Sequence, residues 1–240
     1  MGAVRRSRCN SGDGASRERG PVIRVAIVDD EALVRSGFRL ILSAAPDLEV
    51  VGTFDGSETT DAIVGGKPDV VLLDIRMRGR SGLDILHDIR EMPTPPAVAV
   101  LTTFASDDHI ARALGDGAAG FLVKDTDPEQ LPTLVRSLAA GGIVLSPSIS
   151  RTVIDGYLGA GDRAASRLIE ALTERERQVL ARLVAGESNR EIGSTLHLSV
   201  GTIKDHVSAI LRKLGVATRL QAALVSERAG LTTSFSAVDR

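Results

Sequence analysis

The chain has few of the residues and segments that mark secreted or membrane proteins. Its 240 residues include one cysteine, Cys9, so no disulfide can form within the chain and nothing points to an oxidising compartment. No apolar run approaches the roughly 20 residues that a membrane-spanning helix needs. Residues 1–21 are rich in Arg, Ser and Gly and lack the apolar core of a secretory signal. The sequence therefore predicts a cytoplasmic protein without a membrane partner.

The net charge is also small, at −2, but it is unevenly distributed. Residues 22–145 carry 11 basic against 19 acidic residues, whereas residues 166–230 carry 10 basic against 7 acidic ones. The chain is long enough for two modest domains, and a basic half often binds nucleic acid, although this excess is small. Residues 1–21 hold five arginines that could contact DNA, but we interpret them as a disordered leader or as a start codon placed too early.

Short apolar runs alternate with helical periodicity through the first half of the chain. A nearly unbroken apolar run such as residues 22–28 is typical of a strand that is buried on both faces. Strands that alternate with helices predict a doubly wound parallel sheet with helices on both faces. The expected strands are residues 22–28, 48–53, 70–74, 97–102 and 120–123, and the expected helices are residues 31–44, 57–64, 83–90, 106–114 and 127–140. Asp127, Pro128 and Gln130 fit the N-cap, first and third positions of the last helix.

The last third of the chain changes to short helices with sharply defined starts. A hydroxyl residue followed three positions later by Glu or Gln forms a capping box, in which each side chain accepts a hydrogen bond from the backbone N–H of the other residue. Three such pairs and one plain N-cap, Ser199, predict four helices. The pairs are Thr173–Glu176, Ser188–Glu191 and Thr218–Gln221, and the helices are expected to end near Gly186, Leu198 and Gly215.

Glycines and Pro147 separate these two regions, which is typical of a linker, here with a short helix near residues 149–158. The expected organisation is residues 1–21 as a leader, 22–145 as an α/β domain, 146–171 as a linker, 172–232 as a helical domain and 233–240 as a disordered tail.

Polar side chains gather where the predicted strands end. These are Asp29 and Asp30 after the first run, Asp74 at the end of the third, Thr102 at the end of the fourth and Lys124 after the fifth. The carboxyl ends of neighbouring parallel strands meet at one edge of a sheet, so we expect these side chains to share one crevice. Three carboxylates, a hydroxyl and an ammonium suit a hard divalent cation beside a carboxylate that can be phosphorylated.

At these spacings, about 120 residues of the first half resemble the receiver domains of bacterial response regulators. The resemblance implies a CheY-like fold with five strands in the order 2-1-3-4-5. It implies that Asp74 accepts a phosphoryl group from a histidine kinase. It also implies that Asp30, Asp74 and the carbonyl of Arg76 hold Mg²⁺, with Asp29 helping through water. A cation is needed there because crowded negative charges would otherwise repel the incoming phosphoryl group.

The resemblance gives three further residues a role. Thr102 and Lys124 would contact the phosphoryl oxygens, and Phe121 matches the receiver's switch aromatic, which turns inward when the threonine hydroxyl moves to the phosphate. Phe121 could equally be a strand residue that only packs against a helix. Many receivers have Pro four residues after the phosphoacceptor, whereas this chain has Arg78 followed by Gly79, so its loop is expected to be more basic and less rigid.

Residues 172–216 read LTERERQVLARLVAGESNREIGSTLHLSVGTIKDHVSAILRKLGV and closely resemble the four-helix DNA-binding domain of the NarL/LuxR type. The resemblance implies that residues 188–196 and 199–214 form a helix-turn-helix, whose second helix lies in the major groove. Lys204, Asp205 and Ser208 would face the bases of a promoter duplex, with Thr202 near the backbone. Asp205 would accept from a cytosine amino group. The phosphate contacts would come from Asn189, Arg190 and Arg212 or Lys213.

The last predicted helix, residues 218–228, is expected to make the protein a homodimer when it is active. Small and apolar residues there, Leu220, Ala223 and Leu224 among them, would let two copies pack across a two-fold axis, as is the habit of the family. For the domain as a whole, a helical bundle that binds protein remains the alternative, because it would use the same apolar stripes on the helices of residues 172–216.

The combined prediction is a NarL/LuxR-type two-component response regulator, not an enzyme, with a histidine kinase and double-stranded DNA as partners. One alternative is a metal-dependent phosphohydrolase with Asp74 as nucleophile, but Arg76 stands where a second carboxylate would be needed. Another keeps DNA binding and makes control independent of phosphate. In the unphosphorylated protein we expect the acidic receiver to lie against the basic recognition helix, and phosphorylation to release it and favour the dimer.

Overall fold

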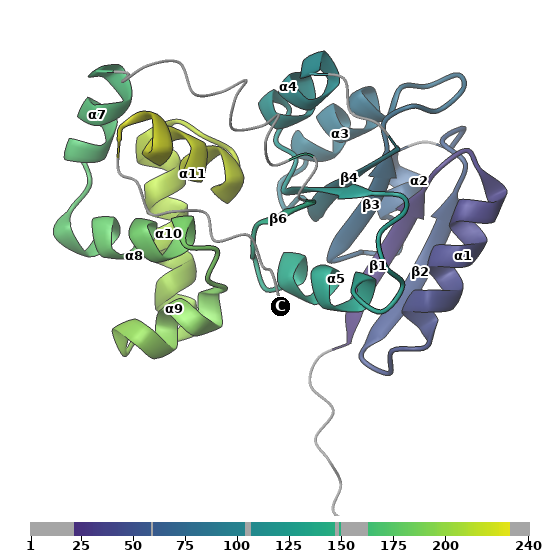
Figure 1. Cartoon of the computed structure of the whole chain (residues 1–240), viewed down its shortest axis with the longest axis horizontal. Coiled ribbons are helices and arrows are strands. Elements are labelled where there is room, and N and C mark those ends of the chain that lie inside the picture. The colour runs from purple at the N-terminus through teal and green to yellow at the C-terminus, as the bar shows by residue number, and fades with distance from the viewer. Residues whose placement is uncertain (1–21, 59, 104–106, 147–148, 150–162, 231–240) are drawn as a thin grey trace, which may run out of the picture.

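The computed structural model describes residues 22–58, 60–103, 107–146, 149 and 163–230. It shows an α/β lobe followed by a helical lobe, and the two lie side by side (Figure 1). The expected leader, the expected tail and the expected helix near residues 149–158 lie, apart from residue 149, outside the described residues.

The α/β lobe is built on one parallel sheet with the strand order β2-β1-β3-β4-β5-β6. Its strands are β1 (Ile23–Val28), β2 (Leu48–Phe54), β3 (Val70–Asp74), β4 (Ala97–Thr102), β5 (Gly120–Val123) and β6 (Val144–Leu145). The expected order of the first five is confirmed. The sixth strand was not predicted, because two residues carry no usable pattern. It forms because β5 would otherwise leave an unpaired edge, and Gly120 and Phe121 pair with Val144 and Leu145 there.

In the described part of the lobe, five helices cover the two faces of this sheet. The helices are α1 (Ala32–Ser43), α2 (Thr60–Val64), α3 (Gly82–Arg90), α4 (Asp107–Gly115) and α5 (Leu131–Ala139). Side chains of α1 and α5 such as Phe38, Leu42 and Val135 form one apolar core with one face of the sheet. Residues of α2, α3 and α4 form a second core on the other face, so β1, β3 and β4 are buried on both sides. The doubly wound arrangement therefore follows from the continuous apolar runs.

The start of α5 differs from the expectation. Asp127 is not its N-cap, because the Asp127 carboxylate accepts a hydrogen bond from the Glu129 N–H at 2.9 Å and closes a separate turn. The helix begins at Leu131, with Gln130 in the N-cap position. A short Asp side chain often bonds to the backbone two residues further on, and here that local bond wins over the helix cap.

The helical lobe contains the four expected helices and one more. They are α7 (Arg163–Glu170), α8 (Glu174–Val184), α9 (Asn189–Leu196), α10 (Val200–Leu214) and α11 (Arg219–Arg228). All three capping boxes and the Ser199 cap are present, so the predicted starts are confirmed. The unpredicted α7 lies in the stretch expected to be a linker, and its Ile169 joins the core of this lobe.

Helix α11 connects the two lobes. Figure 1 places it on the side of the helical lobe that faces the sheet domain. Leu220 and Leu224 are buried in the same apolar cluster as α3 and α4. The Gln221 amide donates to the carbonyl oxygens of Leu114 and Gly115 at 2.6 and 3.2 Å, and an Arg90 guanidinium N–H donates to the Ala217 carbonyl at 3.1 Å.

Candidate functional site

The predicted acidic set does come together at the carboxyl edge of the sheet. Asp74 closes β3, Thr102 closes β4, and Asp29 and Lys124 follow directly on β1 and β5. Asp29, Asp74 and Thr102 are buried, at 0%, 2% and 2% exposed. The sheet order places these three strand ends next to one another, which is the position where open α/β sheets bind ligands.

One ammonium links the carboxylates of this edge. Lys124 Nζ lies 2.9 Å from Asp29 Oδ2, 2.9 Å from Asp74 Oδ2 and 2.8 Å from Glu31 Oε1. Burial lowers the pKa of Lys124, but the hydrogen bonds to Glu31, Asp74 and Asp29 outweigh it and raise that pKa above its usual range. Lys124 is therefore a permanent positive charge at the site.

For the pKa of Asp29, burial outweighs the hydrogen bonds. Burial raises the pKa of Asp29, and the bonds from Lys124 and from the Glu31 N–H do not fully cancel that effect. Close carboxylates of like charge favour the uptake of a counter-ion, since one lysine cannot neutralise all of them.

The residues present fit a hard divalent cation. Carboxylate oxygens of Asp29, Asp30 and Glu31 all lie within 4.8 Å of one another, and carboxylate oxygens are the ligands that Mg²⁺ prefers. Glu31 was not among the predicted ligands, although it directly follows the two aspartates in the sequence. The backbone N–H of Arg76 donates to Asp74 Oδ1 at 2.9 Å, which orients the Asp74 carboxylate.

A glycine holds the Asp74 backbone close to α3. A Cβ atom on Gly82 would lie 2.0 Å from the Asp74 carbonyl oxygen, so no larger residue fits there. The loop between Asp74 and Gly82 is basic, as its sequence shows. The Arg78 N–H donates to Asp30 Oδ2 at 3.2 Å, and Arg80 forms an ion pair with Asp88.

Thr102 and Phe121, which the sequence assigned to a switch, are both buried, so Phe121 already faces inward in this structure and its switch role stays a prediction. The Thr102 hydroxyl is buried and has no hydrogen-bond partner among the described residues. Phe121 is fully buried in the cluster that also contains Ile110 of α4 and the two leucines of α11. The receiver site and the helix that joins the lobes therefore share one packed cluster.

Most of the predicted DNA-contacting residues lie on the surface of the helix-turn-helix. Lys204, Asp205, Ser208 and Arg212 of α10 and Arg190 of α9 are exposed, and Thr202 is half-buried. The Ser208 hydroxyl donates to the Lys204 carbonyl at 2.9 Å, and the Thr202 hydroxyl pairs with that of Ser199 at 2.8 Å. The exposure of α10 contradicts the expectation that the receiver lies against the recognition helix.

Two of the predicted phosphate contacts have other partners in this structure. Lys213 Nζ lies 2.6 Å from Glu176 Oε2, so it forms an ion pair with the carboxylate that caps α8. Asn189 Oδ1 accepts a hydrogen bond from Arg219 at 2.6 Å. Between Arg212 and Lys213, which the sequence did not separate, the structure leaves Arg212 as the candidate for DNA. The sequence predicted Glu176 as a helix cap, but only the tertiary contacts reveal its ion pair with Lys213 and the bond between Arg219 and Asn189.

The residues predicted to pair two chains are buried within one chain. Leu220 and Leu224 pack in the α/β lobe's cluster, whereas Ala223 belongs to the core of the helical lobe. Pairing through Leu220 and Leu224 therefore needs a conformation in which α11 has left the receiver, and it stays a prediction.

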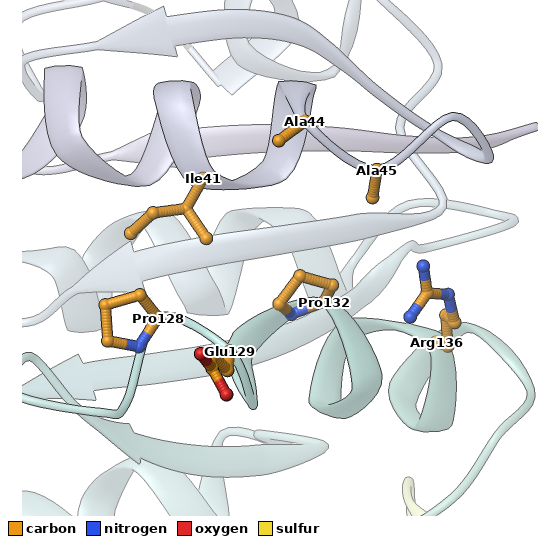
Figure 2. Close-up of a pocket in the computed structure, with 7 residues that line it drawn as sticks. All are labelled: Ile41, Ala44, Ala45, Pro128, Glu129, Pro132 and Arg136. Atoms are coloured by element: carbon orange, nitrogen blue, oxygen red, sulfur yellow. The ribbon is translucent and has the colours of Figure 1, made fainter.

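A separate hollow of about 430 Å³ lies between α1 and the start of α5 (Figure 2). Its lining is mostly apolar, and the charged groups in it are Glu129 and Arg136. It lacks the carboxylates of the acidic edge, so the candidate chemistry lies elsewhere. No helix in the described part of the chain is both long and apolar enough to cross a membrane.

Comparisons with known proteins match both lobes. The family described as "Response regulator receiver domain" matches residues 25–136, and "Bacterial regulatory proteins, luxR family" matches residues 170–226. The transcriptional regulatory protein LiaR of Bacillus subtilis is 34% identical over 208 residues, which are 86% of this chain and 98% of LiaR. The nitrate/nitrite response regulator protein NarL of Escherichia coli K12 is 32% identical over 83% of this chain and 93% of NarL. A crystal structure of a LuxR-family response regulator from Aurantimonas sp. SI85-9A1 aligns with a TM-score of 0.52 at 25% identity, covering 57% of this chain and 99% of that one.

Proposed function

The chain belongs to the transcriptional response regulators that join a receiver domain to a LuxR-type DNA-binding domain, and from this premise we propose that Asp74 is the residue its receiver phosphorylates. As a member of this family it is a DNA-binding transcriptional regulator of a two-component system, whose partners are a histidine kinase and DNA. The proposal adds the residue chemistry, the cation and the way in which the signal reaches DNA.

The position of the Asp74 carboxylate carries the proposal. It is buried at the ligand-binding edge, and Arg76 and Lys124 each donate to one of its oxygens. Thr102 ends the neighbouring strand, and its hydroxyl has no partner among the residues that the structure describes. The lysine that pairs with Asp74 also pairs with Asp29 and Glu31, so one positive charge faces three carboxylates and a cation can still be taken up beside Asp74. That arrangement suits a product with more negative charge than the carboxylate itself.

In the transfer step an Asp74 oxygen attacks the phosphorus of a phosphohistidine. The new O–P bond forms as the P–N bond breaks, and the electron pair returns to the imidazole nitrogen of the kinase. Lys124 stays protonated throughout and can donate to an oxygen of the transferred group. Mg²⁺ bound by Asp29, Asp30 and Glu31 or Asp74 would neutralise the charge that gathers between the carboxylates and the phosphoryl group.

The phosphorylated site needs a hydrogen-bond donor, and Thr102 can supply it. Thr102 pairs with Val123 across β4 and β5, and Val123 packs against the cluster of Phe121, Leu220 and Leu224, so a shift of the Thr102 hydroxyl towards the phosphoryl group can alter the packing of this cluster. The equilibrium between the docked and the free helical lobe then moves towards the free one. Released α11 can pack against a second copy, and two helix-turn-helix units together bind a pseudo-palindromic promoter as a homodimer.

Phosphorylation of an Asp74→Asn variant tests this directly. The full chain is incubated with Mg²⁺ and acetyl phosphate or a histidine kinase, and the acyl phosphate is detected by its sensitivity to hydroxylamine. We expect the wild-type chain to be labelled, the Asp74→Asn chain not, and Asp84→Asn, an exposed acid of α3, to be labelled like the wild type. Labelling of the Asp74→Asn chain would mean that another carboxylate is the acceptor.

A further inference from the structure

Arg219, the first residue of α11, is a buried cation. It is 7% exposed, and among the residues that the structure describes no carboxylate forms an ion pair with it. Burial lowers the pKa of Arg219 to about 10, so the guanidinium is still charged at neutral pH. Its guanidinium donates hydrogen bonds to neutral oxygens, the Glu187 carbonyl at 3.3 Å and the Asn189 side chain at 2.6 Å. A buried charge in such surroundings is costly unless another group compensates it.

The receiver supplies part of that compensation. A Cβ atom on Gly141 would lie 3.4 Å from the Arg219 guanidinium carbon and 3.3 Å from the Asn189 amide nitrogen. Gly141 follows the C-cap of α5 and has φ +78°. The carboxyl end of a helix carries a partial negative charge, so the Arg219 guanidinium, which lies beside Gly141, is next to the negative end of α5.

The same guanidinium sits beside the first helix of the helix-turn-helix. Asn189 is the first residue of α9, and the first helix of such a motif crosses the DNA backbone. Asn189 was predicted to bind a phosphate, yet its amide nitrogen faces the receiver's Gly141 turn. A planar guanidinium with several donors is well matched to a phosphate diester, which would also provide the missing negative charge.

We propose that Arg219 is a ligand for a DNA backbone phosphate, and that the turn after receiver helix α5 occupies its place in this conformation. This inference rests on the proposed function, because it assumes that the helical lobe exchanges between the form docked on the receiver and a form bound to DNA. The receiver and the phosphate compete for Arg219 and Asn189, while the base-reading face of α10 stays exposed. Control then acts on the contact between Arg219 and the DNA phosphate, which we call the phosphate anchor. It therefore lowers the affinity for every DNA sequence alike.

The first test weakens the docking of the receiver and leaves Arg219 and Asn189 themselves unsubstituted. Gly141→Ala crowds Arg219 and strains a backbone with φ +78°, so the docked form weakens. We expect the unphosphorylated Gly141→Ala chain to bind duplex DNA more tightly than the wild type, by roughly fivefold. Gly215→Ala is the matched control, because Gly215 has φ +67° and no atom within 4 Å of its Cβ position, and it should leave the affinity unchanged.

The anchor itself is tested in the Gly141→Ala background. Fluorescence anisotropy with a promoter duplex and a scrambled duplex gives the affinity at several salt concentrations. Adding Arg219→Gln should weaken binding to both duplexes by the same factor and reduce the slope of log affinity against log salt by about 0.9, the loss of one phosphate contact. An unchanged slope with a folded protein would overturn the proposal.

Arginine footprinting tests the anchor without a substitution at Arg219, in case Arg219→Gln does not fold. Phenylglyoxal modification of the Gly141→Ala chain, read by mass spectrometry, should label Arg219 in the free protein and spare it when either duplex is added. Equal labelling of Arg219 with and without DNA, while Arg212 is protected, would refute the inference and leave the DNA-binding function intact. If no form protects any arginine or binds either duplex, the proposed function itself fails.

Discussion

Two neighbouring polar residues of the receiver edge have opposite surroundings. Lys124 is bonded to three carboxylates, and breaking a buried ion pair from one side costs about 3–5 kcal/mol. The Thr102 hydroxyl is buried and has no partner in the described part of the chain. A buried hydroxyl without a hydrogen bond lowers stability, so a group kept in that state points to a task in another state of the protein.

Thr102→Val should separate signalling from stability. Valine has nearly the same shape and removes a buried hydroxyl that has no partner in the described part of the chain, so we expect the free energy of unfolding to stay the same or to rise by about 1 kcal/mol. Phosphorylation should still occur but should raise DNA affinity less than it does in the wild type. Urea unfolding and DNA binding with and without acetyl phosphate measure the two effects.

Thr126→Val provides the comparison. The Thr126 hydroxyl donates to the Val123 carbonyl at 2.6 Å, so its loss should cost about 1 kcal/mol and leave the response to phosphate unchanged. A Thr102→Val chain that is as destabilised as Thr126→Val, or that responds fully to phosphorylation, would contradict the role given to Thr102.

At the scale of single elements, the start of α8 shows how one acid can serve two structures. Burial raises the pKa of Glu176, but bonds from Lys213 and from the backbone and hydroxyl of Thr173 outweigh it and lower that pKa to about 2. The carboxylate caps α8 and holds the last turn of α10 through Lys213. The two helices of the lobe are therefore tied at a point away from the exposed DNA face.

The pH dependence of the helical lobe follows from that shift. The pKa of Glu176 is depressed in the folded state, so its stabilisation is complete above about pH 4.5 and is lost as the pH falls towards 2. Glu176→Gln keeps the side-chain oxygen for the cap. We expect it to lower the free energy of unfolding at pH 7 and to make that free energy fall less steeply between pH 4.5 and pH 2. Circular dichroism along an acid titration measures this, and parallel curves for the two proteins would argue against it.

Lys213 and Arg212 are adjacent basic residues for which the structure predicts different effects. Lys213→Met leaves the Glu176 carboxylate without its ion pair, so we expect a lower melting temperature and an unchanged salt dependence of DNA binding. Arg212→Met removes an exposed charge, so it should leave the melting temperature unchanged and reduce the salt dependence by about one phosphate contact. Melting curves and anisotropy titrations on both variants decide between these assignments, and the reverse pattern would exchange the two roles.

For the whole molecule, the arrangement of the lobes determines what DNA and a second copy can reach. Helix α11 is docked on the α4 side of the receiver, whereas the outer face of α10 remains accessible. The docked form therefore blocks the pairing of two chains through α11, but it leaves the base-contacting face of α10 accessible. Control of this kind can leave weak single-site binding in place while the affinity gained from pairing is withheld.

Arg90→Met should shift the lobes apart in the unphosphorylated protein. The substitution keeps an apolar stem but removes the donor to the Ala217 carbonyl, a contact worth about 1 kcal/mol. We expect tighter DNA binding, roughly fivefold, and more dimer in sedimentation velocity. Arg112→Met, on the exposed side of α4, is the control and should behave like the wild type. A monomeric Arg90→Met chain with wild-type affinity would show that the docked α11 is not what limits activity.

Local pattern in the sequence was enough for most of the fold. Continuous apolar runs indicated buried parallel strands, and the polar residues at their ends, Asp29, Asp74, Thr102 and Lys124, do meet at one edge. The capping boxes located three helix starts in the second lobe because both partners of each box lie within one turn. These features are determined over a few residues, and the sheet topology then follows from the strand-helix alternation.

What the tertiary structure alone decided concerns contacts between residues far apart in the chain. The sequence shows Asn189, Lys213 and Leu224 as surface groups of the right type for DNA or for a second copy. Folding instead brings Lys213 to Glu176, Asn189 to Arg219 and Leu224 to the receiver. A side chain's partner depends on which helix faces arrive beside it, and that is set by packing across the lobes, which no periodicity within one helix encodes.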